Sequence, residues 1–342
     1  MAEAIIYIPW VVDGKSEEFH PRVQESRPVL RLIEGMSRKL RHIPVGGSLV
    51  EVTCRTIQGR LLMRPSPLLN DIILGVLGRA QRLYPLEVVG YSFLSNHYHL
   101  LLWVETAERL SDFMRYFSGN VAREIARLTG WKDRVWADRY DGILVTDEEE
   151  VQVKRLAYVL SNCVKENLVA RVEEWPGVHC GRPLLTGNWV AEGTWFDRRM
   201  EYNARLRGKE PEPREFTRPE QAVLSQLPCW KHLTPEEYRC RIAELVQGIE
   251  ETAAAARQES LIKPLGVDGI RAQNPETRPR NLKKSPAPFV HAATKAARKA
   301  VWEAYATFVA AFREAADRLK AGDRNAVFPI GSFPPRLPFV MA

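Results

Sequence analysis

Two of the seven histidines in the chain, His97 and His99, lie two residues apart in a segment that is typical of a β-strand. Successive side chains of a strand point to opposite faces, so both imidazoles project from the same face. Two neighbouring imidazoles can bind a metal ion, although a complete site needs a third ligand and a group that reacts. The apolar run from Leu100 to Val104 predicts that this strand is buried. The pair therefore predicts a metal site on a rigid strand.

A predicted helix further along the chain supplies candidates for the missing groups. Tyr158 and Asn162 are four residues apart on it, so their side chains lie on the same face, and Lys154 and Lys165 lie roughly on that face as well. If this face packs against the sheet, the amide oxygen of Asn162 can complete the metal shell, and Tyr158 can reach a phosphate that the metal holds. Each of these residues alone is more often structural, and only their combination favours catalysis.

The elements predicted around these residues follow the order β, α, β, β, α, β, α. Strands are expected at residues 48–63, 86–93, 97–104 and 134–145, and helices at residues 66–85, 107–128 and 147–168. This order is the split βαβ pattern and predicts an α+β fold: a ferredoxin-like, four-stranded antiparallel sheet with helices on one face. Its first and third strands would be central. Asp147 and Glu150 are expected to form a capping box at the start of the last helix.

Three segments are expected along the chain. Residues 1–45 form an N-terminal extension with a helix at 29–40, and residues 46–182 form the catalytic domain. Residues 183–342 form a mostly helical C-terminal region with a basic, Pro-rich linker and tail. Its helices are expected at residues 196–207, 235–261 and 292–319, its linker at 262–290 and its Pro-rich tail at 328–340.

Charge and cysteine usage narrow the partners and the compartment. The net charge of +7 is unevenly spread, with clusters of Lys and Arg at residues 38–64 and 278–299, which is typical of contacts with phosphates. The five cysteines are scattered and lack the spacing of zinc sites, which favours free thiols in a reducing cytoplasm. No stretch reaches the length of a transmembrane helix, so we expect no membrane partner.

The combined pattern resembles that of a known enzyme family. The segment from Asn96 to Leu102 is similar to the HUH motif (His, hydrophobic, His) of single-tyrosine transposases, and Tyr158 followed by Asn162 resembles their nucleophile helix. Over roughly residues 46–180 the chain is similar to the insertion-sequence 200-like transposases, in particular to the REP-associated tyrosine transposase branch. Tyr98 stands where an aliphatic residue is usual, at a position that is expected to face away from the site.

This resemblance implies a prokaryotic, nucleoid-associated enzyme that cleaves and rejoins single-stranded, hairpin-associated DNA. Tyr158 would be the nucleophile and would form a 5′-phosphotyrosine intermediate. His97, His99 and Asn162 would bind Mg²⁺ or Mn²⁺. The protein would act as a monomer or a homodimer, since relatives of both kinds occur.

Single-stranded DNA is bound by basic surface together with aromatic rings on which bases stack. The candidates for stacking are Trp131, Trp136 and Tyr140. The eight cations that we expect to contact DNA are Arg55, Arg60, Arg64, Arg115, Arg123, Arg127, Lys154 and Lys165.

Three other functions remain open for a chain of this pattern. The first is a DNA-binding regulator that keeps the fold without the chemistry, against which the intact set of His97, His99, Tyr158 and Asn162 argues. The second is an HUH nickase for replication or plasmid transfer, although these enzymes commonly use more than one tyrosine. The third is an RNA-binding module, which would carry exposed aromatic residues where the histidines stand.

Overall fold

The computed structural model describes residues 40–210, 212, 215–279 and 287–332. The expected helix at residues 29–40 and the Pro-rich tail lie for the most part outside these residues. Residues 43–298 form one compact unit, and the described parts of residues 1–42 and 299–342 belong to another. In this other unit, Phe308 of α9 (Lys295–Lys320) packs on His42, with ring centroids 4.3 Å apart. None of the helices in the described ranges is apolar over a length that could cross a membrane.

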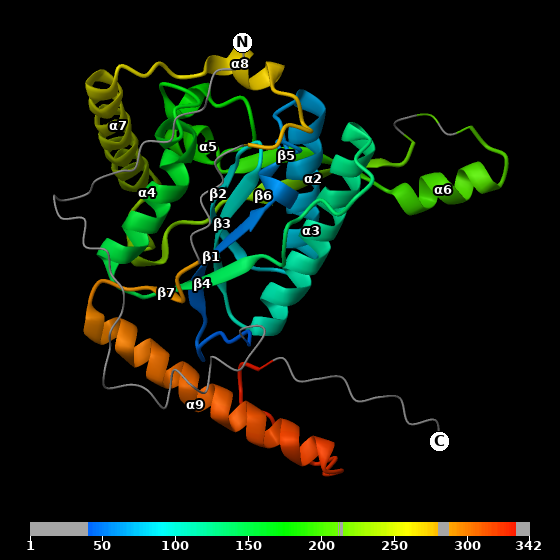
Figure 1. Cartoon of the computed structure of the whole chain (residues 1–342), viewed down its shortest axis with the longest axis vertical. Coiled ribbons are helices and arrows are strands. Elements are labelled where there is room, and N and C mark those ends of the chain that lie inside the picture. Colours follow the sequence, from blue (N-terminus) through cyan, green and yellow to red (C-terminus); the bar gives the residue numbers. More distant parts are fainter. Residues whose placement is uncertain (1–39, 211, 213–214, 280–286, 333–342) are drawn as a thin grey trace. The chain divides into compact units, whose positions relative to one another are not determined.

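The unit of residues 43–298 is built around a five-stranded sheet with the strand order β2-β3-β1-β4-β7 (Figure 1). β1 pairs antiparallel with both β3 and β4, and β2 pairs antiparallel with β3. The α+β class and the central position of the first and third strands are therefore confirmed. The strands are β1 (Ser48–Arg55), β2 (Glu87–Phe93), β3 (His97–Val104), β4 (Asp141–Val145) and β7 (Val290–His291).

β7 makes the sheet larger than the predicted four strands. It pairs in parallel with β4 at the edge of the sheet, and it comes from the segment that the sequence predicts as a linker. Val290 is buried opposite Leu144. A strand of two residues is too short to carry an alternating pattern, so the sequence around it gives no signal for a strand.

Helices cover both faces of the sheet, so the prediction of helices on one face is wrong in this respect. Adjacent residues of β3 show the two sides: Tyr98 contacts Phe117 of α3, whereas His99 contacts Tyr158 of α4. α2 lies with α3, and Figure 1 shows α3 and α4 on opposite sides of the sheet. α4 follows the last strand of the split βαβ pattern. The order of the elements therefore does not determine which face of the sheet α4 covers. The three helices are α2 (Pro67–Leu83), α3 (Ala107–Thr129) and α4 (Glu149–Lys165).

The start of α4 differs from the prediction. Its N-cap is Glu148, which makes no side-chain capping bond, so the expected capping box of Asp147 and Glu150 does not form. The side chain of Glu149 in the first turn takes part in a tertiary contact instead, because it accepts a hydrogen bond of 2.7 Å from the indole N–H of Trp230. Tertiary packing here outweighs the local capping preference.

A hairpin that the sequence does not reveal packs against α2. β5 (Val190–Phe196) and β6 (Thr217–Val223) pair antiparallel, and α6 (Arg198–Leu206) lies between them in the chain. At Gly75 and Gly78 of α2, a Cβ atom would come within 2.2 Å and 2.6 Å of the hairpin backbone. The remaining elements of the unit are the short turns η1 (Ile57–Gly59), η2 (Val172–Glu174) and η3 (Pro228–Trp230), and the helices α5 (Gly181–Thr186), α7 (Pro235–Ser260) and α8 (Gly266–Ala272).

The close approach at α2 gives a test of this packing. We expect Gly75→Ala to lower the free energy of unfolding by about 1–3 kcal/mol, because the new Cβ atom overlaps backbone that cannot move aside like a side-chain tip. Gly248→Ala on α7 is the control, since its Cβ meets no atom within 4 Å. There alanine favours the helix by roughly 0.5–1 kcal/mol, so stability should rise. Urea denaturation measures both, and wild-type stability of the Gly75 variant would contradict the packing.

Candidate functional site

β3 and α4 bring the two histidines and the tyrosine of the predicted site together. His97 and His99 project from the same face of β3, with ring centroids 5.2 Å apart and ring planes at 86°. The ring of Tyr158 meets His99 in an edge-to-face contact, again with centroids 5.2 Å apart. The face of α4 that carries Tyr158 therefore lies against the histidines.

Each histidine has its Nδ1 atom engaged by a neighbouring oxygen. Nδ1 of His97 lies 2.7 Å from Oδ1 of Asn96, and Nδ1 of His99 lies 3.0 Å from Oε1 of Glu51. A carboxylate only accepts hydrogen bonds, so Nδ1 of His99 donates to Glu51, and Nδ1 of His97 donates to Asn96 when the amide oxygen faces it. In a neutral ring of this tautomer the lone pair is on Nε2, which is the arrangement in which a histidine can bind a metal ion.

Asn162 lies about one helical turn after Tyr158 and is buried, with 1% of its surface exposed. Within the described part of the chain, its Nδ2 atom has no hydrogen-bond partner. Buried polar atoms without a partner are rare, so this amide is a candidate for binding a ligand. The oxygen and nitrogen of an amide exchange places by a half-turn, so either atom can occupy this position.

These donors fit a divalent ion by their chemistry. Two imidazole nitrogens and one amide oxygen give three ligands, and the amide supplies the oxygen that Mg²⁺ prefers. Among the residues that the structure describes, no group of three or more His, Cys, Asp and Glu could hold a metal ion. Asn162 is therefore the candidate for a third protein ligand in addition to the two histidines.

Two cations lie over the ring of Tyr158. Cζ of Arg155 is 4.5 Å from the ring centroid and Nζ of Lys165 is 4.8 Å from it. Burial lowers the pKa of Lys165 from its ordinary value. Lys154, four residues before Tyr158, is exposed on α4. Of the predicted DNA contacts, Lys165 thus lies inside the site and Lys154 at its surface.

A buried carboxylate next to His99 is part of the site, and the sequence analysis missed it. Glu51 on β1 is 2% exposed, and its Oε2 atom lies 3.1 Å from Nε2 of His291 and 3.4 Å from Nη1 of Arg155. Among the described residues Oε2 has no hydrogen-bond partner, so these are close contacts rather than hydrogen bonds. Burial raises the pKa of Glu51, but His291, His99 and Arg155 together lower it to well below its ordinary value. The sequence signal that could have identified Glu51 is a charged residue within the apolar run of a central strand.

Arg55 is the predicted DNA contact that lies nearest to the histidines along the sheet. It is exposed at the end of β1, directly opposite His97 in the register of β1 and β3. Burial lowers the pKa of His97 well below its ordinary value, and His99, Arg55 and Lys165 lower it further. The His97 ring is therefore neutral at neutral pH.

Arg60 and Arg64 are engaged within the chain. Both guanidinium groups donate to backbone carbonyls of residues 271–276, and Arg64 reaches two of these carbonyls at 3.1 Å each. The guanidinium of Arg60 also lies over the ring of Trp131, 4.8 Å from its centroid. These two predicted DNA contacts thus bind the end of α8 and the segment that follows it.

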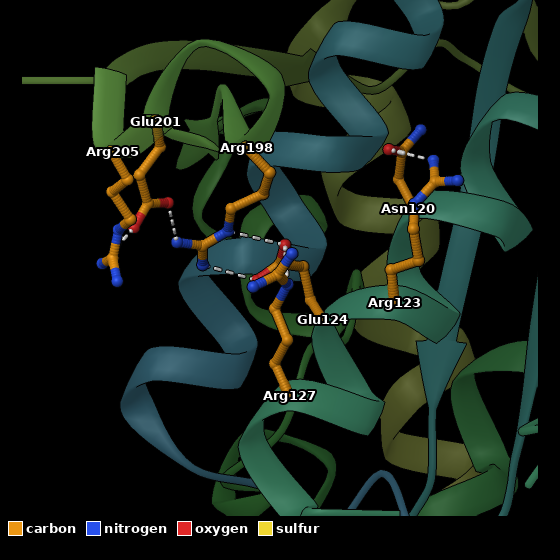
Figure 2. Close-up of polar contacts among 7 residues, drawn as sticks. All are labelled: Asn120, Arg123, Glu124, Arg127, Arg198, Glu201 and Arg205. Atoms are coloured by element: carbon orange, nitrogen blue, oxygen red, sulfur yellow. Dashed lines mark hydrogen bonds and ion pairs between the residues drawn. The ribbon is translucent and has the colours of Figure 1, made fainter. Parts of the chain in front are cut away.

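The three predicted DNA contacts on α3 lie on the opposite side of the sheet from the histidines. Arg115 pairs with Asp112, and Arg123 donates to Asn120. Arg127 lies 3.7 Å from Glu124, a carboxylate that also accepts two hydrogen bonds from Arg198 of α6. Figure 2 shows this cluster, in which Arg198 also contacts Glu201, and Glu201 contacts Arg205. The structure does not bring these arginines to the site.

Tyr98 faces away from the histidines, as the sequence predicted. It is fully buried among Phe93, Phe117 and Trp136, and its hydroxyl lies 3.1 Å from Oγ of Ser118. The indole N–H of Trp136 donates to the carbonyl of Ser118 at 2.9 Å. Trp136 is therefore a packing residue on the far side of β3 rather than a platform for bases beside the histidines.

No protein-family model matches the chain, and no curated protein matches it. Two solved structures are similar to part of it. A REP-associated tyrosine transposase bound to a REP hairpin is 19% identical, with 45% of this chain and 87% of that chain covered, at a TM-score of 0.33. A candidate transposase from Deinococcus radiodurans is 17% identical, with 35% of this chain and 94% of that chain covered, at a TM-score of 0.26.

The packing of Tyr98 can be tested by removal of its hydroxyl. We expect Tyr98→Phe to lower the free energy of unfolding by about 1 kcal/mol, because a buried hydrogen bond to Ser118 is lost while the ring stays. Tyr202→Phe on α6 is the matched control, since Tyr202 is 62% exposed and its change should leave stability unaltered. Thermal unfolding of both variants is the measurement. Equal melting temperatures for the two variants would argue against the buried bond.

Proposed function

We propose that the protein is a transposase-type enzyme that cleaves and rejoins single-stranded, hairpin-associated DNA through a 5′-phosphotyrosine intermediate. One observation carries this proposal: the Tyr158 ring contacts His99, and the Nδ1 atoms of His97 and His99 face the oxygens of Asn96 and Glu51, which leaves both Nε2 atoms to bind a ligand. A nucleophile on one element and two metal-binding nitrogens on another thus meet at one place. Such an arrangement supports phosphoryl transfer to the tyrosine.

The reaction of this site consumes no water. The phenol oxygen of Tyr158 attacks phosphorus, the bond between phosphorus and the 3′ oxygen breaks, and the leaving oxygen takes up the proton that the phenol loses. The 5′ side of the DNA then stays on Tyr158 as a phosphodiester, and the other side ends in a free 3′-OH. Attack by a different 3′-OH on the phosphotyrosine releases Tyr158 and joins the strand elsewhere.

The residues around Tyr158 have separate tasks in this reaction. Arg155 and Lys165, which lie over the ring, stabilise negative charge as it develops on the phenol oxygen. His97, His99 and Asn162 would hold Mg²⁺ or Mn²⁺. When bound, such an ion polarises the scissile phosphate.

We assign the contacts with the DNA backbone at the site to Arg55, Lys154 and Lys165. Arg55 faces His97 across the two central strands, and the two lysines lie on α4 before and after Tyr158. The arginines of α3 lie behind the sheet and are paired within the chain. They would reach only DNA that passes round to the other face.

A covalent adduct is the direct test of the nucleophile. Incubation of the protein with labelled single-stranded hairpin DNA and Mn²⁺ should give a protein–DNA adduct on a denaturing gel, because the phosphotyrosine bond survives denaturation. Tyr158→Phe should give no adduct, whereas Tyr202→Phe, changed at an exposed tyrosine of α6, should match wild type. An unchanged adduct from Tyr158→Phe would refute the assignment. Binding by wild type without any cleavage would favour the regulator.

Metal binding can be measured apart from cleavage. We expect His99→Ala to weaken Mn²⁺ binding at least about tenfold, because the change removes a metal ligand. Loss of a residue that only supports a metal ligand already weakens binding by about this factor. His232→Ala is the control, since His232 is exposed on the segment that precedes α7. Titration followed by the electron paramagnetic resonance of free Mn²⁺ gives both affinities. Equal affinities would mean that the histidine pair does not bind the metal.

A further inference from the structure

We propose that His291 of β7 is a positioning residue for His99 and acts through Glu51. A candidate metal ligand would then be held in position by a residue that lies far beyond the segment that resembles the transposases. This inference rests on the proposed role of His99 as a metal ligand. The contacts that support it are described one step at a time below.

The first step is the contact between Glu51 and His99. Oε1 of Glu51 lies 3.0 Å from Nδ1 of His99, and both side chains are buried, at 3% and 7% exposure. A carboxylate in this place accepts the Nδ1 proton, which leaves Nε2 as the metal-binding atom and fixes the rotation of the ring. The direction in which His99 presents its lone pair thus depends on where Glu51 stands.

The second step is what holds Glu51. Its other oxygen, Oε2, faces Nε2 of His291 at 3.1 Å and the Arg155 guanidinium at 3.4 Å. A buried carboxylate that loses one of its charged or polar neighbours is destabilised, so Glu51 depends on these neighbours for its position. Nη1 of Arg155 donates a hydrogen bond of 3.1 Å to Nε2 of His291, so His291 holds the guanidinium beside Oε2. The three groups therefore restrain one another, and Arg155 in addition lies over Tyr158.

The third step is what holds His291. Its backbone carbonyl accepts hydrogen bonds from both the amide N–H and the hydroxyl of Thr146, each at 3.0 Å. Its strand neighbour Val290 is buried and pairs with Leu144 of β4. A segment of two residues is thus fixed to the edge of the sheet in the register that puts the His291 ring against Glu51. The position of β7 is therefore transmitted to His99 through a single carboxylate.

The test uses the full chain without metal and reads the tautomer of His99 directly. With ¹⁵N-labelled histidine, long-range ¹H–¹⁵N correlation spectra distinguish a ring protonated on Nδ1 from one protonated on Nε2. In wild type we expect His99 to be protonated on Nδ1 alone. In His291→Asn, whose side chain is too short to reach Glu51, we expect a mixture of the two tautomers. His291→Gln places an amide oxygen near the position of Nε2, where it can accept from Arg155, and should restore the wild-type spectrum.

A second readout is the affinity for Mn²⁺. We expect His291→Asn to weaken it by about 10- to 100-fold, the range seen when a residue that supports a ligand is lost, and His291→Gln to stay within about threefold of wild type. His232→Asn on the surface is the control for the loss of a histidine. Asn and Gln are both polar amides and differ in the length of the side chain. A difference in Mn²⁺ affinity between the two variants therefore reports whether the side chain reaches its partner, and not a general loss of protein stability. Measured melting temperatures serve as the check that both variants fold.

The outcomes separate this inference from the proposed function. If His291→Asn leaves both the tautomer of His99 and the Mn²⁺ affinity at wild-type values, His291 does not position His99. If His291→Asn and His291→Gln lose affinity equally, the effect of residue 291 is structural and the inference is likewise overturned. Failure of the adduct assay would instead refute the role of Tyr158, while a tautomer that depends on residue 291 would still support the positioning of His99.

Discussion

A carboxylate buried in the middle of a central strand sets the main constraint on this structure. Glu51 is 2% exposed, and a charge at such a place is tolerated only when charged and polar groups surround it. Those groups come from three elements that are far apart in sequence: β3 with His99, α4 with Arg155 and β7 with His291. The placement of α4 and β7 around β1 is thus coupled to one charge, which also lies directly behind a candidate metal ligand.

The alternation of β3 separates a side that packs against α3 from a side that carries the candidate site. Tyr98 points into an aromatic cluster with Phe93 and Phe117, while the histidines before and after it point toward α4. Close-packed interiors resist change in volume, so the aromatic side holds the strand in place. The histidine side can then carry polar groups that would weaken a core. Adjacent residues of β3 thus differ in role, because Tyr98 packs in the core while His97 and His99 belong to the candidate site.

Much of the central sheet could be predicted from its own residues. β3 and α3 have strong patterns, and their bounds differ from the expected ones by one residue at most. The failures are of a different kind. β7 has two residues and depends wholly on β4, and the role of Glu51 appears only when His99, Arg155 and His291 are placed around it.

The arginines show the same limit. The helical pattern predicts which side of α3 is polar, but it does not predict which face of the sheet α3 covers. The sequence therefore predicts Arg123 and Arg127 beside the histidines, whereas α3 lies on the opposite face of the sheet. The sequence predicts Arg60 and Arg64 as DNA contacts because their actual partners are backbone carbonyls, which cannot be recognised from residue types. Local periodicity thus predicts elements, whereas contacts distant in sequence decide which side chains meet.

The two-residue strand β7 affects how this chain can be divided. A fragment that ends at residue 182 would keep every residue of the histidine motif and of the nucleophile helix, yet it would leave one oxygen of Glu51 without His291. Grafting the motif-bearing half onto another C-terminal region would have the same result. The histidine motif therefore cannot be transferred to another protein with its surroundings intact unless β7 is included. The smallest fragment that preserves the surroundings of His99 extends at least to residue 291.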